Sequence, residues 1–273
     1  MRARAPHRIP GRHARRHGRS RIRRDAGRPV VFMPIPDGLI VLTFDDGVKS
    51  QFTFAAPLLK SLGFEATFYI TEGLNFLTDK SRYMTWDEVA ELDKMGFEIG
   101  NHTRAHASVA KQTPDELRSD IDHIDRRCEE YGITRPVTFC YPGYVHTPEA
   151  VAVNRERGFT FARRGTAPEF SYDSEGGRGP AYDPSSHDPL LVPTTGASGP
   201  HWGMDDFKWA LDQARDGRVT VLTFHGVPDL DHPWVHTDPN VFEGYVRHLH
   251  DNGYQVVSIS GCSTHLEGAD RTG

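Results

Sequence analysis

The 273-residue sequence has no long apolar run and very little cysteine. No hydrophobic stretch approaches the roughly 20 residues that cross a bilayer, so we expect neither a transmembrane segment nor a membrane partner. The three cysteines are odd in number and widely spaced, which excludes a disulfide framework and a zinc site built from cysteine ligands. No Gly-x-Ser-x-Gly motif is present, so a serine hydrolase of that type is also excluded.

Lysine is absent from the first 28 residues, which hold 11 arginines and a single acidic residue, Asp25. This segment carries a charge of +10, so the rest of the chain carries -15 of the total of -5. An acidic body argues against a basic nucleic-acid-binding face, and we expect no nucleic-acid partner. The head lacks apolar periodicity, which predicts a disordered tail over residues 1–32. An arm that binds nucleic acid or another anionic surface is the alternative for this segment.

The head also lacks the apolar core of a secretory signal, although it contains paired arginines. We therefore expect a cytoplasmic protein. From residue 33 the composition becomes that of a folded protein, and no linker divides the chain before residue 262. We expect one domain over residues 33–262 and a short tail over residues 263–273. The oligomeric state stays open.

Strand-like and helix-like segments alternate along this body. The strands are short apolar runs, and the helices have apolar residues at helical spacing between threonine and glycine ends. The expected strands cover residues 39–44, 65–70, 97–100, 137–142, 159–165, 219–226 and 254–259. The expected helices cover residues 51–63, 85–96, 113–132, 147–158, 204–217 and 240–253. About seven such units predict an α/β fold with a parallel sheet that closes like a barrel.

The longest connection, residues 165–203, is rich in glycine, proline and serine. One further strand is expected inside it, at residues 190–195. A connection of this length within a compact domain is usually functional.

Reactive side chains follow several of the expected strands. In an α/β barrel these strand ends share one rim. Asp45 and Asp46 follow the first strand, His102 and His106 follow the third, and His225 follows the penultimate one. Two imidazoles and one carboxylate suit zinc or a neighbouring first-row ion and leave a coordination position open for water. A chance pair among the 15 histidines is the alternative explanation.

The adjacent acids suggest that the two carboxylates have different roles. Successive side chains of a strand point to opposite faces, so the turn at Gly47 has to redirect one of them. One carboxylate can then bind the metal while the other stays free as a base. A solvated turn is the alternative for this pair. The sequence His-Pro-Trp at 232–234 adds an aromatic side chain to a later loop, either for core packing or for a sugar contact.

These motifs, in this order, resemble the polysaccharide deacetylase family, the NodB-homology group of carbohydrate esterase family four. TFDDG (43–47) resembles the first motif, His102-Thr103-x-x-His106 the second, and Leu222-Thr223-Phe224-His225 the last. The middle motif normally begins with arginine, whereas FCYPGY (139–144) has Cys140 at that place. The resemblance covers residues 38–260. It implies a distorted (β/α) barrel that uses a divalent metal to remove acetyl groups from sugars.

The resemblance also implies a role for each matching residue. The roles are base for Asp45, acid for His225, metal ligand for Asp46, His102 and His106, and oxyanion or substrate contact for Tyr141, Gly143 and Tyr144. The implied cofactor is one divalent ion, with zinc expected and cobalt, nickel or manganese as alternatives. The family also places a leucine near the acetyl methyl group, where this sequence has Thr223.

Cys140 cannot orient the base as the family's arginine does, because a thiol is only a weak donor. Arg163 and Arg164 follow the next strand, and alternation allows only one of them to reach the rim. We expect that one to replace the missing arginine. Solvated loop positions for both are the alternative.

The complete set of residues predicts a metal-dependent hydrolase, with a carbohydrate as its partner. It would remove acetyl groups from N-acetylated sugars or polysaccharides by water attack, with an aspartate base and a histidine acid. A hydrolase of the same fold that acts on a small non-sugar amide or an acetyl ester is an alternative. A non-catalytic carbohydrate-binding relative is another, although such a module needs no base, ligands and acid together.

Overall fold

The computed structural model describes residues 35–171 and 176–266. The tail predicted at residues 1–32 lies outside the described residues, as do residues 267–273 of the predicted C-terminal tail. The first residues of that C-terminal segment form a short helix, α8 (Ser263–Leu266). No helix of the described chain combines the length and the apolarity needed to cross a membrane.

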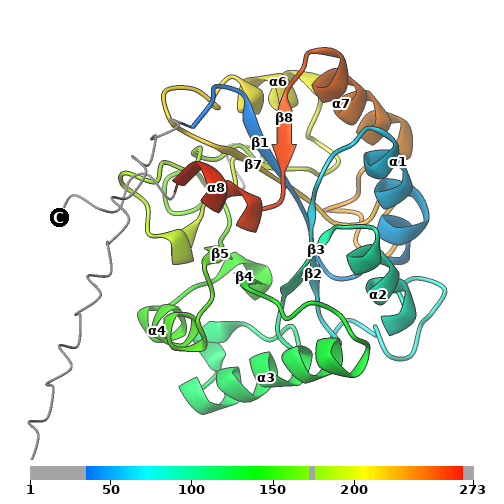
Figure 1. Cartoon of the computed structure of the whole chain (residues 1–273), viewed down its shortest axis with the longest axis vertical. Coiled ribbons are helices and arrows are strands. Elements are labelled where there is room, and N and C mark those ends of the chain that lie inside the picture. The colour runs from blue at the N-terminus through cyan, green and yellow to red at the C-terminus, as the bar shows by residue number, and fades with distance from the viewer. Residues whose placement is uncertain (1–34, 172–175, 267–273) are drawn as a thin grey trace, which may run out of the picture. The chain divides into compact units, whose positions relative to one another are not determined.

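Strands and helices alternate along the described chain as the sequence predicts (Figure 1). The strands are β1 (Leu39–Phe44), β2 (Thr67–Ile70), β3 (Glu98–Asn101), β4 (Thr138–Cys140), β5 (Phe161–Arg163), β6 (Gly196–Ala197), β7 (Thr220–Phe224) and β8 (Gln255–Val257). The longer helices are α1 (Ala56–Ser61), α2 (Trp86–Lys94), α3 (Pro114–Glu130), α4 (Pro148–Arg157), α6 (Met204–Leu211) and α7 (Pro239–Asp251). These helices lie around the strands in Figure 1.

The strands pair in parallel in the order β5-β4-β3-β2-β1-β7-β6. Strand β8 pairs with the beginning of β1, while β2 pairs with its end. The predicted α/β barrel with about seven parallel strands is confirmed, since the added strand β6 has only two residues. In a parallel sheet the carboxyl ends of all strands meet at one edge, and this edge carries the site described below.

The long connection after β5 joins the two edges of the curled sheet. Val192 forms a parallel bridge with Arg163 of β5, and β6 then pairs with β7 through Gly196 and Leu222. The strand predicted at residues 190–195 is displaced, because a 3₁₀ turn occupies residues 189–191. Pro193 also removes one main-chain donor from that run.

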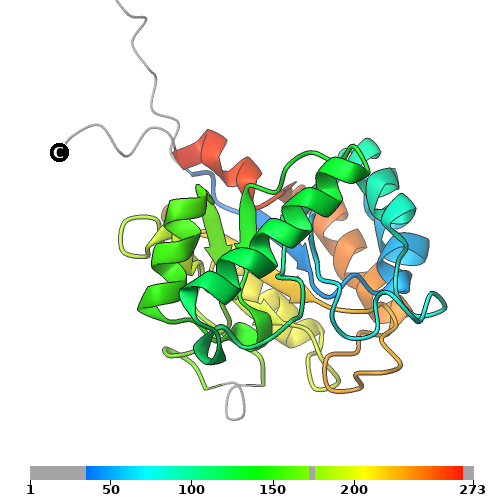
Figure 2. The same ribbon diagram turned by 90° about the horizontal axis from the view of Figure 1, so that it is seen from below.

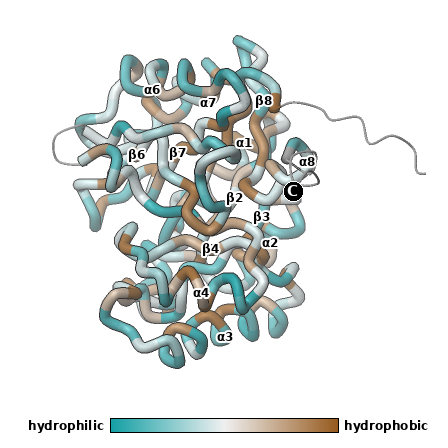
Figure 3. The backbone as a smooth tube through the Cα atoms, turned by 90° about the vertical axis from the view of Figure 1, so that its left-hand side faces the viewer, coloured by the Kyte–Doolittle hydropathy of each residue, from teal (hydrophilic) through white to brown (hydrophobic). Residues whose placement is uncertain are grey.

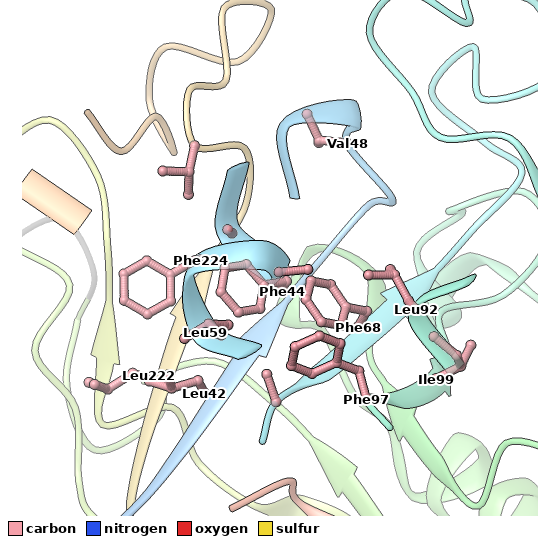
Figure 4. Close-up of a cluster of buried hydrophobic side chains, with 14 of the residues drawn as sticks. Leu42, Phe44, Val48, Leu59, Phe68, Leu92, Phe97, Ile99, Leu222 and Phe224 are labelled. Carbon is pink, nitrogen blue, oxygen red and sulfur yellow. The ribbon is translucent and has the colours of Figure 1, made fainter. Parts of the chain in front are cut away.

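Alternation along β1 separates two cores. Ile40, Leu42 and Phe44 point outward, toward a core covered by α1, α2, α6 and α7. In Figure 4 the ring of Phe44 lies between those of Phe68 and Phe224, with ring centroids 4.8 and 5.5 Å apart. Leu39 and Val41 point inward, into a second core inside the curled sheet. The same alternation directs the next residues of the series, 43 and 45, to the inside.

Helices α2 and α3 begin at the threonines that the sequence indicates. Thr85 accepts the main-chain N–H of Glu88, and Thr113 accepts that of Glu116, each within a complete capping box. Helices α3 and α4 lie side by side (Figure 2) and are joined by an ion pair between Arg118 and Glu156 at 2.8 Å. The helices alternate between hydrophilic and hydrophobic along their turns (Figure 3), as expected of helices that cover a sheet on one side.

Candidate active site and metal centre

The carboxyl ends of β1, β3, β4 and β7 meet around a cavity of about 410 Å³. It brings together five predicted residues, namely Asp45, Asp46, His102, His106 and His225. Its walls also include Leu74, Gly143, Tyr144, His232, Trp234 and Val235. The strand ends therefore form one rim, as the sequence predicts.

The two adjacent aspartates face different partners because the chain turns between them. Asp45 continues the inward series of β1 and is buried. Asp46 and Gly47 have φ angles of 76° and 67°, which is the left-handed region. Glycine adopts this conformation freely, and aspartate is one of the few other residues that tolerate it. The turn at Gly47 thus redirects one carboxylate as predicted, and it is that of Asp46.

Asp46 faces two imidazoles. Its Oδ1 lies 3.4 Å from Nε2 of His102 and 3.2 Å from Nε2 of His106. The two histidines do not share a helical face, because Thr103 and His106 both have positive φ and residues 102–106 form a loop. The loop folds back so that the two ring centroids lie 4.8 Å apart.

The chemistry of this set fits a divalent cation. Nδ1 of His102 lies 2.8 Å from the main-chain oxygen of Cys140, which can only accept a hydrogen bond, so Nδ1 carries the proton and donates it. In the neutral ring Nε2 then presents a lone pair toward Asp46. The potential ligand atoms of Asp46, His102 and His106 lie within 4.8 Å of one another. A carbonyl that orients a histidine through its other ring nitrogen is a regular feature of metal sites.

The carboxylates and imidazoles of the site shift the pKa values of one another. Burial raises the pKa of Asp46, but the neighbouring imidazoles outweigh it and bring that pKa well below its usual value. Burial lowers the pKa of His102, but the carboxylates of Asp46 and Asp45 raise it above its usual value. Both shifts follow from the close approach of the carboxylates and the imidazoles, which keeps Asp46 ionised.

Asp45 is held by Arg163. The Nη2 of Arg163 donates to Oδ1 of Asp45 at 2.6 Å and also contacts Oδ2. Its Nη1 donates to Oγ1 of Thr194 at 3.0 Å, and both charged side chains are buried. Burial raises the pKa of Asp45, but the charges of Arg163 and of the nearby imidazoles lower it by more. The pKa of Asp45 therefore lies below its usual value.

Arg164 points the other way. It pairs with Glu169 at 2.6 Å and donates to the main-chain oxygens of Leu191 and Gly165. Only one of the two arginines therefore reaches the rim, and it is Arg163. The sequence alone left this choice open.

Cys140 leaves the space that the Arg163 guanidinium occupies. The two residues are register partners on β4 and β5, and the Sγ of Cys140 lies 2.8 Å from Nη2 of Arg163. Burial raises the pKa of the Cys140 thiol well above its usual value, so the thiol stays neutral. The guanidinium beside Asp45 thus comes from β5, the strand next to β4, which carries Cys140 at the place of the family's arginine.

His225 faces both carboxylates. Its Nε2 lies 3.8 Å from Oδ2 of Asp45 and 3.9 Å from Oδ2 of Asp46. His225 as a residue is 9 % exposed and lines the cavity. Its Nδ1 is buried without a hydrogen-bond partner among the described residues.

The turn after β4 supplies the remaining predicted contacts. Gly143 has a φ of 60° and lines the cavity, as does Tyr144. The Tyr144 ring also lies over the Arg163 guanidinium, with 5.5 Å from Cζ to the ring centroid. The structure places the Tyr141 side chain outside the cavity, because alternation turns it outward and its hydroxyl donates to the Leu190 carbonyl at 3.0 Å.

Trp234 of the His-Pro-Trp sequence stands at the cavity wall and is 62 % exposed, so core packing is not its role. Two further residues were not predicted. Thr194 contacts Arg163 from the long connection, where only the length of that segment indicated a function. Gln51 donates to the main-chain oxygens of Asp45 and His225. The sequence feature that could have indicated it is a polar residue on the buried face of an otherwise apolar helix.

Comparisons with known proteins find similarity to polysaccharide deacetylases. The family model described as polysaccharide deacetylase matches residues 33–162. The peptidoglycan-N-acetylglucosamine deacetylase of Bacillus cereus is 28% identical over 128 residues, which cover 46% of this chain and 56% of that protein. A putative polysaccharide deacetylase of Bacillus subtilis is 22% identical over 44% of this chain and 42% of its own length. The chain thus matches about half the length of these curated relatives.

Solved structures share the fold over most of the chain. A family 4 acetyl xylan esterase from Clostridium thermocellum, solved in complex with a cobalt ion, is 23% identical with a TM-score of 0.54. The superposition covers 84% of this chain and 92% of that one. At 23% identity this similarity shows a shared fold and no more.

Proposed function

We propose that this chain, a member of the polysaccharide deacetylase family, is a metal-dependent hydrolase that removes acetyl groups from N-acetylated sugars. The observation that carries the proposal is the separation of two adjacent carboxylates within one cavity. Asp46 faces two imidazoles, whereas Asp45 faces a guanidinium and His225. This division suits one carboxylate as a metal ligand and the other as a base.

We assign Asp46, His102 and His106 as the ligands of one divalent ion, with zinc as the proposed metal and cobalt, nickel or manganese as alternatives. When bound, such an ion supplies a Lewis acid that lowers the pKa of a water and polarises an acetyl carbonyl. The carbonyl of Cys140 fixes the His102 ring through Nδ1, so the ring is oriented before the ion arrives.

Asp45 acts as the base that takes a proton from the attacking water. Its lowered pKa keeps it ionised at neutral pH, and Arg163 fixes its orientation through charge-assisted hydrogen bonds to both oxygens. The water oxygen bonds to the acetyl carbon and the carbonyl electron pair moves to its oxygen, which gives a tetrahedral intermediate. The carbon–nitrogen bond breaks when this intermediate collapses and the carbonyl group re-forms. His225 donates a proton to the leaving amine, which would otherwise leave as an unstable anion.

The main-chain N–H of Gly143 is the proposed donor to the oxyanion of the tetrahedral intermediate. Gly143 lies at the cavity wall in a left-handed turn, so its main chain is close to the space that the acetyl group would fill. Tyr144 is the proposed neighbouring substrate contact. Any contribution of Tyr141 would come from its main chain, since its side chain packs outside the cavity.

The test is acetate release from N-acetyl sugars, their oligomers and acetyl esters, with each divalent metal added back to chelated protein. We expect release from the N-acetyl substrates and about one bound ion per chain. His102→Ala and His106→Ala should both lose most of the metal and the activity. Full metal occupancy in both variants would overturn the ligand set. Release from esters or small amides alone would favour the alternative hydrolase, and sugar binding without release would favour a non-catalytic relative.

A further inference from the structure

The main-chain pairing of strands β1 and β7 ends next to Asp45 and His225. The last register pair is Phe44 with Phe224, and the N–H of Asp45 then donates to the Phe224 oxygen at 3.0 Å. Beyond that bond the left-handed conformation of Asp46 turns the chain of β1 away. The carbonyl groups of Asp45 and His225 are therefore left beyond the end of the main-chain ladder.

The side chain of Gln51 spans this gap. Its Nε2 donates to the main-chain oxygen of Asp45 and, at 3.2 Å, to that of His225. A primary amide has two N–H donors on one nitrogen, so a single side chain can serve both carbonyls. Gln51 is fully buried, and a buried carbonyl without a donor is unfavourable. The side chain thus replaces the next main-chain rung between the two strands.

The local backbone fits this position. Gln51 opens a π-helical turn, Gln51–Ala55, in which the N–H of Ala56 bonds to the Gln51 oxygen. Such turns are rare and occur frequently at functional sites. The residue before it, Ser50, attaches the same turn to the loop after β7. Its Oγ accepts the N–H of Val227 and donates to the oxygen of Pro228, both at 2.8 Å.

We propose that Gln51 is a positioning residue that sets the distance between the base Asp45 and the acid His225. The inference rests on the proposed function, since it takes these two residues as the base and the acid. Both must act on the same tetrahedral carbon, one on the incoming water and the other on the leaving nitrogen. Displacement of a reacting group by about 1 Å can lower turnover about 100-fold. A bond to both main chains holds that spacing directly.

The test compares Gln51→Met with Ser50→Ala in the metal-loaded full chain. Methionine has a similar length but no donor, so the two carbonyls lose their shared partner. We expect Gln51→Met to lower kcat about 10- to 100-fold, with KM and metal content nearly unchanged. Ser50→Ala removes hydrogen bonds between the same two segments but not those to Asp45 and His225. Ser50→Ala should lower Tm about as much as Gln51→Met does, but it should leave kcat close to that of the wild type.

A second variant sharpens the test. Gln51→Glu keeps the shape of the side chain but turns a carboxylate oxygen toward two carbonyl oxygens, and we expect a loss of kcat at least as large. Wild-type kcat in Gln51→Met, or equal loss of kcat in Ser50→Ala, would overturn the proposal. If the wild type releases no acetate, the proposed function fails. Crystal structures of the wild type and Gln51→Met then decide separately, since an unchanged separation of the Asp45 and His225 main chains would overturn the positioning role.

Discussion

The outer and inner faces of the strands differ in how their chemistry changes along the chain. On the outer face of β1, Ile40, Leu42 and Phe44 are all apolar and packed beneath helices. On the inner face the series runs from apolar Leu39 and Val41 through Thr43 to the charged Asp45. Strand β7 follows the same course inside the barrel, from Val219 and Val221 through Thr223 to His225. The outer face holds the fold together, whereas the inner face grades from a core into a site.

A layer of threonines lies between the apolar floor and the charged rim. The hydroxyl of Thr223 lies 3.3 Å from that of Thr43 and 3.1 Å from that of Thr194, which in turn accepts from Arg163. This series of hydroxyl contacts explains why Thr223 stands where the family resemblance implies a leucine. Its hydroxyl belongs to the polar layer beneath Arg163, and buried polar groups need such partners. Substitutions on the two faces should therefore have different consequences.

The largest effect is expected at the carboxylate on the inner rim. Asp45→Asn removes the proposed base but none of the proposed metal ligands, so turnover should fall about 10²- to 10⁴-fold with the metal retained. The matched variant Asp46→Asn should lose metal affinity first. Acetate release and metal content measured on the same preparations check both. Metal loss in Asp45→Asn with retention in Asp46→Asn would mean that the roles are reversed.

A change on the outer face of the same strand should affect stability instead. Leu42 is fully buried beneath the helices, and Leu42→Ala should lower the free energy of unfolding by about 2–5 kcal/mol. Turnover per folded molecule should stay close to that of the wild type, because the side chain points away from the cavity. Denaturant unfolding and kinetics below the transition check this. A large fall in kcat with little loss of stability would show that the two faces are not independent.

Arg163 and Arg164 allow the sharpest comparison, since they are neighbours on opposite faces. Arg163→Ala should lower turnover about 10- to 100-fold with metal retained, which is about 1.4–2.7 kcal/mol of barrier. Arg164→Ala should change turnover little, because its partner is Glu169. Arg163→Ala leaves the buried Asp45 without its cation, so Arg163→Lys, which keeps the charge, serves as a second variant. Equal turnover in both alanine variants would remove Arg163 from base orientation.

These arginines also show what the sequence could predict. The order of strands and helices follows from apolar runs and end signals, and the grouping of Asp45, Asp46 and His225 follows from the shared rim of a parallel barrel. The choice between Arg163 and Arg164 does not follow. Phe161 and Ala162 before them are both apolar, so a three-residue strand gives no sign of which face is inside. The pattern of apolar and polar residues therefore does not indicate which of the two arginines faces the inside of the barrel.

The other omissions have a common physical cause. The loop that brings His102 and His106 together depends on left-handed residues that are not glycine, and local propensity does not indicate these. Gln51 donates to the main-chain oxygens of Asp45 and His225, and the latter is 174 residues away in the sequence. Contacts of this kind depend on the completed barrel rather than on any segment.

One carboxyl lies among the residues at the beginning of the strands, away from the charged rim. Glu98 stands at the beginning of β3, at the end of the barrel opposite the site. It accepts hydrogen bonds from the hydroxyls of Thr67 and Thr138, at 2.9 and 2.7 Å, and from the N–H of Ser260. The ion pairs of the described chain include none with Glu98. Burial raises the pKa of Glu98 above its usual value in spite of these bonds, whereas Arg163 helps to lower that of Asp45.

The smallest effect is therefore expected at Glu98, as a change in the pH dependence of stability. At pH values below 4.5, its ordinary pKa, the carboxyl is protonated in both the folded and the unfolded chain, and its contribution to stability is fully present. As the pH rises through the raised pKa of the folded state, the folded chain must hold a partly buried anion and this contribution is lost. Glu98→Gln cannot ionise, so its Tm relative to the wild type should improve between acidic and mildly basic pH. The change should be a few degrees, since about 1 kcal/mol corresponds to about 2–4 °C in a domain of this size. Thermal unfolding of both proteins over that pH range measures it, and a Tm difference that stays constant or moves against the variant would show that Glu98 does not bear the cost of burial.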